Sequence, residues 1–198
     1  LCTVTDYLIQ PRLQNHPGIA DLSNGALSSV TIQTFLDEGN RPEVVAAVLH
    51  LAVGKNTLAD NVSLGGLVAA IDIESGTLGP ATDSGKSPDV GWRDVHPDTG
   101  GQIAGRTLPI WQEALDLARR AHAAFPDRIV VGWDMALTAD GPLLIEGDPR
   151  GFVTMKQRAY GKPFGEMRYG ELFAHHIKRL TNGRRCAGGL ERSGHRRK

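Results

Sequence analysis

The stretch Val130–Asp148, which reads VVGWDMALTADGPLLIEGD, carries three acids, Asp134, Glu146 and Asp148, on the two sides of a candidate turn that contains a fourth, Asp140. Residues 139–141 (ADG) have the composition of a three-residue hairpin loop that ends on a left-handed glycine. This loop pairs Asp134 with Glu146, and Asp148 shares their face because side chains alternate along a strand. Mg²⁺ prefers oxygen ligands and takes one or two carboxylates together with substrate phosphates. The sequence therefore predicts Asp134, Glu146 and Asp148 as ligands of a metal ion.

Two alternatives remain open on spacing alone. The three acids can be unrelated surface residues of a hairpin, or a two-residue loop can shift the register and separate Asp134 from the other two. If the acids do converge, their mutual repulsion requires a bound cation or a retained proton. The same register sends the apolar residues of the hairpin into the core, and these are Val131, Trp133, Met135, Leu137, Leu143 and Ile145.

The elements that must hold this hairpin follow from hydrophobic patterning. Strands are expected at Val4–Ile9, Ser29–Leu36, Val44–Val53, Leu67–Ile73, Ile129–Thr138 and Leu143–Asp148. The apolar run Val44–Val53 also fits a short helix, but the turn residues on both sides favour a strand. Helices are expected between Pro109 and Pro126 and at Glu171–Leu180, and a loop at Gly79–Gly105. This order predicts an α+β fold with a mainly antiparallel sheet and flanking helices.

Composition limits the class of protein. The 198 residues are 40% hydrophobic and carry no net charge, and no apolar run is long enough to cross a membrane. Cys2 and Cys186 lie near opposite ends, which excludes a disulfide framework and favours a reducing, cytoplasmic setting. The last residues are rich in glycine and arginine, so we expect a body at 1–180 and a disordered basic tail at 181–198. No aromatic residue lies among the tail arginines, and the tail therefore does not favour nucleic acid.

The chain resembles the carboxyl-terminal part of ATP-grasp enzymes, in particular the sugar-transfer-associated ATP-grasp group, which is related to alpha-L-glutamate ligases. The resemblance runs from about residue 7 to residue 177 and rests on several stretches in the same order. These are IQPRLQNHP (Ile9–Pro17), ALSSVTIQT (Ala26–Thr34), DNVSLGGLVAAIDIESGTLG (Asp60–Gly79), HPDTGGQIAGRTLPIW (His96–Trp111), GWDMALTADGPLLIEGD (Gly132–Asp148) and MRYGELFAHHI (Met167–Ile177). The amino-terminal lobe of such enzymes lies upstream of the matched region, so we expect most of it to be missing from this chain.

The resemblance implies an ATP-dependent ligase that uses Mg²⁺ or Mn²⁺. Such an enzyme transfers the γ-phosphoryl group of ATP to a carboxylate, and an amine or similar nucleophile then attacks the acyl phosphate. Its partners would be a small-molecule carboxylate and a small-molecule amine, and the group is associated with sugar and polysaccharide pathways. In this fold one strand supplies an acid and the next supplies an E-x-N pair. Asp134 and Glu146 match this pattern, and Asp148 replaces the asparagine.

The resemblance assigns further residues to the nucleotide site. Asn61, with Gly65 and Gly66, matches a glycine turn near the phosphates and the acceptor, and we expect a catalytic role for Asn61 there. Gly65 and Gly66 would bind the cofactor through their backbone. Gln10 falls where the hinge of the family meets the adenine.

Two positions depart from the family pattern. Thr31 and His50 stand where the family usually carries arginine, and neither side chain holds an oxyanion as a guanidinium does. Arg150, two residues after Asp148, is a candidate catalytic replacement for the missing positive charge. The same departures motivate two alternatives to the ligase, namely a non-catalytic module that binds a nucleotide or glycan precursor, and a phosphotransferase on the same fold.

Overall fold

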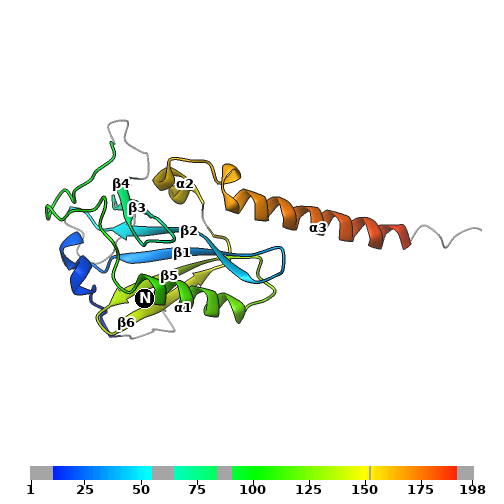
Figure 1. The fold of residues 1–198 in the computed structure, drawn as a ribbon, viewed down its shortest axis with the longest axis horizontal. Helices are drawn as coiled ribbons and strands as arrows, with labels where there is room; N and C mark the ends of the chain where they lie inside the picture. The colour runs from blue at the N-terminus through cyan, green and yellow to red at the C-terminus, as the bar shows by residue number, and fades with distance from the viewer. Residues whose placement is uncertain (1–10, 55–64, 84–90, 152, 191–198) are drawn as a thin grey trace, which may run out of the picture.

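A computed structural model shows an α+β fold built on one antiparallel six-stranded sheet (Figure 1). The structure describes residues 11–54, 65–83, 91–151 and 153–190. The strand order is β4-β3-β2-β1-β5-β6, and every neighbouring pair is antiparallel. The strands are β1 (Ser29–Leu36), β2 (Pro42–Leu51), β3 (Leu67–Ile71), β4 (Leu78–Thr82), β5 (Val130–Thr138) and β6 (Gly141–Asp148). The helices are α1 (Trp111–Ala123), α2 (Thr154–Tyr160) and α3 (Arg168–Leu190), with short 3-10 helices η1 (Pro17–Leu22) and η3 (Phe164–Glu166).

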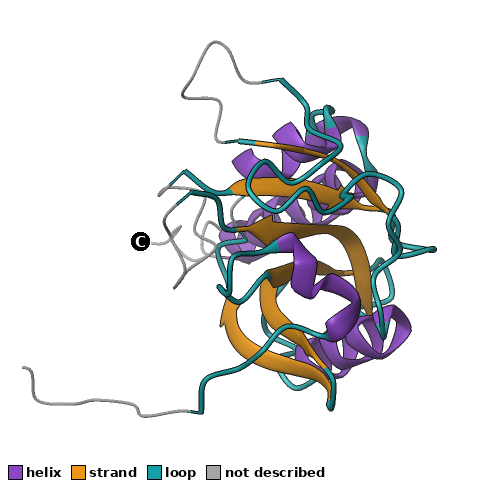
Figure 2. Ribbon diagram, turned by 90° about the vertical axis from the view of Figure 1, so that its left-hand side faces the viewer, coloured by secondary structure: helices purple, strands orange, loops and turns teal. Residues whose placement is uncertain are grey.

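Helices cover both faces of the sheet (Figure 2). On one face, Trp111, Leu115 and Ala118 of α1 pack into the main core with Ile32 of β1 and Met135 of β5. On the other face, α2 packs against β2 and β3, and the start of α3 packs near the β1–β2 turn. Because side chains alternate along a strand, β1 and β5 supply one face to the core and the other to the α2 side.

Most expected elements are confirmed, and the apolar run of β2 is a strand and not a helix. Two segments differ from the expectation. β4 overlaps the segment expected as a loop, because its sequence LGPAT has little of the alternation that marks a strand. α3 begins at Arg168 and continues to Leu190, so it enters the segment for which composition predicted disorder. The strand expected at 4–9 lies outside the described residues.

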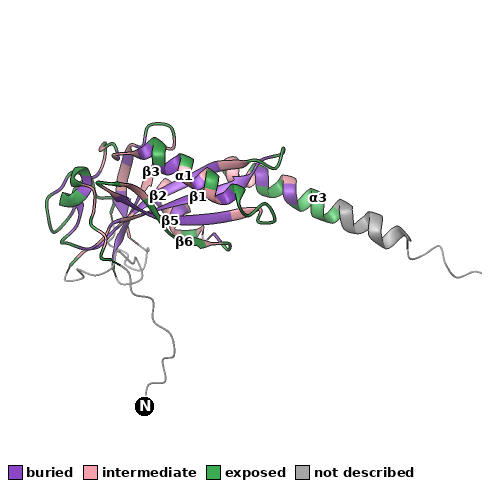
Figure 3. Cartoon of the chain, turned by 90° about the horizontal axis from the view of Figure 1, so that it is seen from below, coloured by how far each residue is buried: buried purple, intermediate pink, exposed green. Residues whose placement is uncertain are grey.

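The core prediction for the hairpin holds only for β5. Val131, Trp133 and Met135 are buried, as is Leu137, but Leu143 and Ile145 of β6 are each 44% exposed. The prediction for these two residues is wrong because β6 is the edge strand and pairs only with β5 among the described strands. Figure 3 shows the same contrast, with β1 and β5 mostly buried and β6 mostly exposed.

α3 extends away from the body and is exposed along most of its described side chains (Figures 1 and 3). No helix in the described ranges is both long and apolar enough to cross a membrane.

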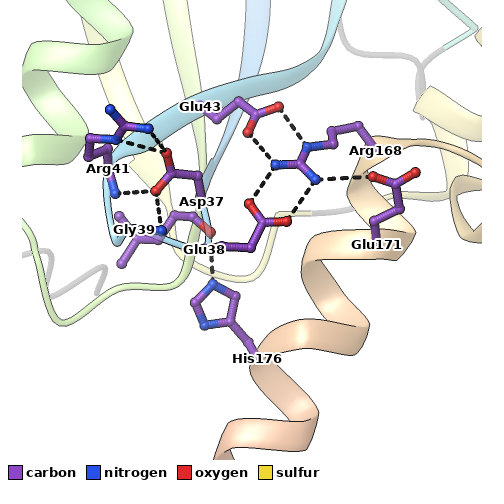
Figure 4. Close-up of polar contacts among 9 residues, drawn as sticks. Asp37, Glu38, Gly39, Arg41, Glu43, Arg168, Glu171 and His176 are labelled. Atoms are coloured by element: carbon purple, nitrogen blue, oxygen red, sulfur yellow. Dashed lines mark hydrogen bonds and ion pairs between the residues drawn. The ribbon is translucent and has the colours of Figure 1, made fainter.

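The first turn of α3 is held to the β1–β2 hairpin by Arg168 (Figure 4). Its guanidinium donates two hydrogen bonds to Glu43 at 2.9 Å, two to Glu38 at 2.9 and 2.7 Å, and one to Glu171 at 3.0 Å.

The β1–β2 turn that Arg168 meets is itself ordered by one carboxylate. Asp37 accepts hydrogen bonds from the backbone N–H groups of Gly39 and Arg41, both at 2.8 Å, and Asn40 between them has a φ of 60°. Asparagine tolerates this left-handed conformation better than most residues. Nε2 of His176 is 2.7 Å from the backbone oxygen of Leu36, so a second residue of α3 contacts the same hairpin.

Arg168→Met is expected to lower the melting temperature and to make the start of α3 more sensitive to limited proteolysis. The hydrogen bond from Arg168 is the main cause that lowers the pKa of Glu38 to about 2. A carboxyl whose pKa is depressed by folding contributes stability above its unfolded pKa, and this is lost as the pH falls toward 2. The melting temperature of the variant should therefore fall less than that of the wild type between pH 5 and pH 2.5. Lys178→Met, which removes an exposed cation of α3, is the matched control. Equal effects of both changes would show that Arg168 does not hold α3 to the β1–β2 hairpin.

Gly76→Ala is expected to be more destabilising than Gly100→Ala, although both glycines have a φ of +73°. An added Cβ at Gly76 would lie 2.6 Å from Cγ of the buried Trp111, whereas nothing lies within 4 Å at Gly100. The left-handed backbone costs a non-glycine residue about 1–2 kcal/mol at either position, and overpacking adds about 1–3 kcal/mol at Gly76. Equilibrium denaturation in urea measures the difference, and equal losses would show that Trp111 does not constrain Gly76.

Candidate functional site

The α2 side of the sheet carries a cavity of about 180 Å³. Its walls come from β1, β2, β5, the end of β6, the turn after β6, and α2. The lining residues are Thr31, Val48, His50, Gly132, Asp134, Asp148, Gly151, Met155 and Lys156. The cavity thus combines two carboxylates, a lysine and a histidine with apolar walls, and it lies across the sheet from the α1 core.

The β5–β6 hairpin differs from the predicted one in its loop length and in the regularity of its strand pairing. Thr138 pairs with Gly141, so the loop has two residues and not three, and the prediction of its length is wrong. An irregularity between Met135, paired with Leu144, and Asp134, paired with Glu146, inserts one extra residue in β6. The predicted pairing of Asp134 with Glu146 is confirmed. The one residue inserted by this β-bulge cancels the one-residue shift that the shorter loop causes.

The structure brings two of the three predicted metal ligands to the cavity. Asp134 and Asp148 line it, whereas Glu146 is exposed and does not line it. In the described part of the chain, no group of three or more His, Cys, Asp or Glu side chains stands ready to hold a metal. Two carboxylates nevertheless suit a Mg²⁺ ion that completes its shell with water and substrate phosphates. The donor set fits a metal that arrives with a nucleotide better than one bound by the protein alone.

A chain of hydrogen bonds orients Asp134. The Thr31 hydroxyl donates to Oδ1 of Asp134 at 2.5 Å and is 2.9 Å from Nε2 of His50. The hydroxyl has one proton, which it gives to the carboxylate, so it accepts the second hydrogen bond from Nε2–H of His50. Thr31 is 8% exposed. The two residues at the arginine positions of the family therefore fix the direction of a carboxylate.

Lys156 is the functional candidate that sequence reasoning missed. It lies on α2, is 5% exposed and lines the cavity with the two aspartates. Burial lowers the pKa of Lys156 to about 8, while the charges of Asp134 and Asp148 act in the opposite direction. The helix that carries it was not predicted, because seven residues are too few for a clear amphipathic pattern. A lysine eight residues after an acidic strand end is by itself no signal.

The remaining predicted residues either do not line the cavity or lie outside the described residues. Arg150 lies outside the cavity lining, its side chain is 77% exposed, and its Nε is 3.3 Å from Oδ1 of Asp148. Gly65 and Gly66 directly precede β3, with a φ of +96° at Gly65, and neither lines the cavity. Gln10 and Asn61 lie outside the described residues. The roles assigned to these five residues stay predictions.

Fold and cavity together define an antiparallel lobe with acidic residues on two neighbouring strands, as in ATP-grasp proteins. Comparison with protein families agrees, since residues 3–167 match the family described as sugar-transfer associated ATP-grasp. The chain belongs to this family. Neither the curated proteins nor the solved structures give a match to it. Family membership supports ATP binding and ligase-type chemistry, and it leaves the reaction and its substrates to be proposed.

Thr31→Val is expected to lower the free energy of unfolding by about 1–3 kcal/mol. The change keeps the shape of the side chain but removes the donor to a part-buried carboxylate, and hydrogen bonds to charged groups contribute this much. Thr31→Ser keeps the hydroxyl and is the matched control, with a smaller loss expected. Equilibrium denaturation of the three proteins measures the effect. A larger loss in the serine variant would show that packing of the methyl group matters more than the hydrogen bond.

Proposed function

We propose that this chain acts as an ATP- and Mg²⁺-dependent ligase of ATP-grasp type, which activates a carboxylate with ATP and joins it to an amine or similar nucleophile. One observation carries the proposal. In a member of the ATP-grasp family, Asp134 on β5 and Asp148 on β6 converge on one cavity of the sheet. Mg²⁺ or Mn²⁺ bound there by Asp134 and Asp148 would neutralise the phosphate charge during transfer, and Glu146, which pairs with Asp134 in the sheet, is the third proposed ligand.

The proposed reaction has two balanced steps. A carboxylate oxygen attacks the γ-phosphorus of ATP, and the bond to the β-γ bridging oxygen breaks, which gives an acyl phosphate and ADP. The nucleophile then attacks the acyl carbon, inorganic phosphate leaves, and the amine proton passes to solvent. Residues of this chain would orient and shield these groups. Thr31 and His50 hold Asp134 in position, and the apolar side chains of Val48 and Met155 exclude water from the cavity wall.

The substrates and setting follow from this chemistry. A small-molecule carboxylate and an amine are the proposed partners, in a sugar or polysaccharide pathway as the family description suggests. A reaction that consumes ATP points to the cytoplasm as its place. The resemblance puts other nucleotide-binding groups upstream, so binding is best measured both on the chain and on a version that carries any upstream sequence of the natural gene.

The proposal predicts that ADP binds only when Mg²⁺ is present, which calorimetric titration can measure. Asp134→Asn combined with Asp148→Asn is expected to weaken this binding at least about tenfold, because the metal loses both charged oxygen ligands that line the cavity. Asp140→Asn is the matched control, since Asp140 is an exposed acid in the turn of the same hairpin. Binding that needs no metal, or that survives the double change, would contradict the proposal.

A non-catalytic binding module is the second candidate, and one observation favours it. The residues that β1 and β2 bring to the cavity are Thr31, Val48 and His50, so these strands offer its lining no guanidinium for an oxyanion. Release of ADP from ATP in a screen of carboxylates with amines would exclude this candidate. A phosphorylated product without ligation would indicate a phosphotransferase on the same fold.

A further inference from the structure

Lys156 is a buried charged side chain of the cavity lining, and the chemistry described so far does not use it. Lysine is almost never buried unless its charge is paired, because removing an ammonium from water is costly. Lys156 is only 5% exposed, yet it lines an open cavity instead of the closed core. A buried cation at this place requires either a purely structural role beside the aspartates or a ligand that uses its charge.

Each element around the cavity contributes to the charge that Lys156 meets. β5 and β6 bring Asp134 and Asp148, while β1 and β2 bring Thr31 and His50. Arg150, in the turn after β6, is paired with Asp148 and is mainly exposed to solvent. The lining therefore combines two carboxylates with a lysine and a histidine. This combination suits a ligand that is itself both cationic and anionic, such as a metal-bound phosphate.

The helix that carries Lys156 is fixed to the sheet. The Tyr160 hydroxyl accepts a hydrogen bond from the backbone N–H of Ala47 at 3.0 Å, and it lies 2.8 Å from the backbone oxygen of Ile71, to which it donates. Ala159 packs against Val48 and Val68. These contacts join α2 to β2 and β3, so the backbone position of Lys156 is set before any ligand binds.

We propose that Lys156 binds an oxyanion of the reactants in this cavity, while Asp134 and Asp148 hold the metal. The inference rests on the proposed function and extends it by naming the residue that recognises the anion. Lysine binds phosphate as a compact charge and needs no two-point geometry, so it can act from a helix where an arginine on a strand is absent. The cavity volume equals that of about six waters, which leaves space for an oxyanion beside the ammonium.

The test compares Lys156→Met, Lys156→Arg and the wild type, with Lys162→Met as the matched control. Lys162 is an exposed lysine directly after α2, so its loss removes the same charge outside the cavity. Three probes are titrated separately, namely Mn²⁺ alone, inorganic pyrophosphate with Mg²⁺, and ADP with Mg²⁺. A fourth probe, acetate followed by NMR chemical shifts, reports a carboxylate instead of a phosphate.

The proposal expects opposite responses of anion and metal in Lys156→Met. Pyrophosphate and ADP should bind about tenfold weaker or more, because a charge-assisted hydrogen bond is lost. Mn²⁺ alone should bind as well as to the wild type or better, since a like charge leaves the cavity. Lys156→Arg should restore part of the anion affinity, and Lys162→Met should change nothing. If only the acetate response is lost, the oxyanion belongs to the carboxylate substrate and not to the nucleotide.

Two outcomes would overturn the assignment. If Lys156→Met binds Mn²⁺ more tightly with every anion unchanged, Lys156 serves only as the counter-ion of the aspartates. If the wild type itself binds neither pyrophosphate, ADP nor acetate, no oxyanion site exists and the assignment fails with the proposed function. If ADP binding survives the combined Asp134→Asn and Asp148→Asn change while pyrophosphate binding still weakens in Lys156→Met, the ligase proposal fails and the role of Lys156 stands.

Discussion

The pairing of β1 between β2 and β5 is the constraint on which core and cavity both depend. In one register it places Ile32 in the core packed on α1 and Thr31 beside Asp134 in the cavity. A slip of one residue would exchange the two faces, removing Thr31 from its hydrogen bonds and burying it among apolar side chains. The large apolar residues on the α1 side of β1 and β5 therefore fix the strand register, and this register positions the polar residues on the other side.

Charge balance is the second constraint on the cavity. Asp148 adds a negative charge to the cavity, and two cations lie close to it in the structure, Arg150 by an ion pair and Lys156 by its place in the cavity. The positive charge thus comes from the turn and helix after β6. On β1 and β2, Thr31 donates a hydrogen bond to Asp134, and His50 contacts the Thr31 hydroxyl.

The outer parts of the fold depend on a few anchors. α3 reaches beyond the body, and Arg168 and His176 join its first turns to the β1–β2 hairpin (Figure 4). At the β6 edge of the sheet, Leu143 and Ile145 are exposed, since no described strand pairs with the outer side of β6. The cavity is lined by β1, β2, β5, the end of β6 and α2. Its position agrees with the need for a rigid scaffold around charged groups.

The sequence by itself determined the α+β class, most strands and α1, because hydrophobic periodicity and turn residues are local signals. It also carried the family resemblance, since the matching stretches lie in order along the chain. Tertiary structure decided what local signals do not contain. The bulge in β6 corrected a wrongly predicted loop, the edge position of β6 exposed residues expected in the core, and a seven-residue helix brought Lys156 to the aspartates. These features depend on contacts between segments far apart in the chain, and a reading of one segment at a time does not reach them.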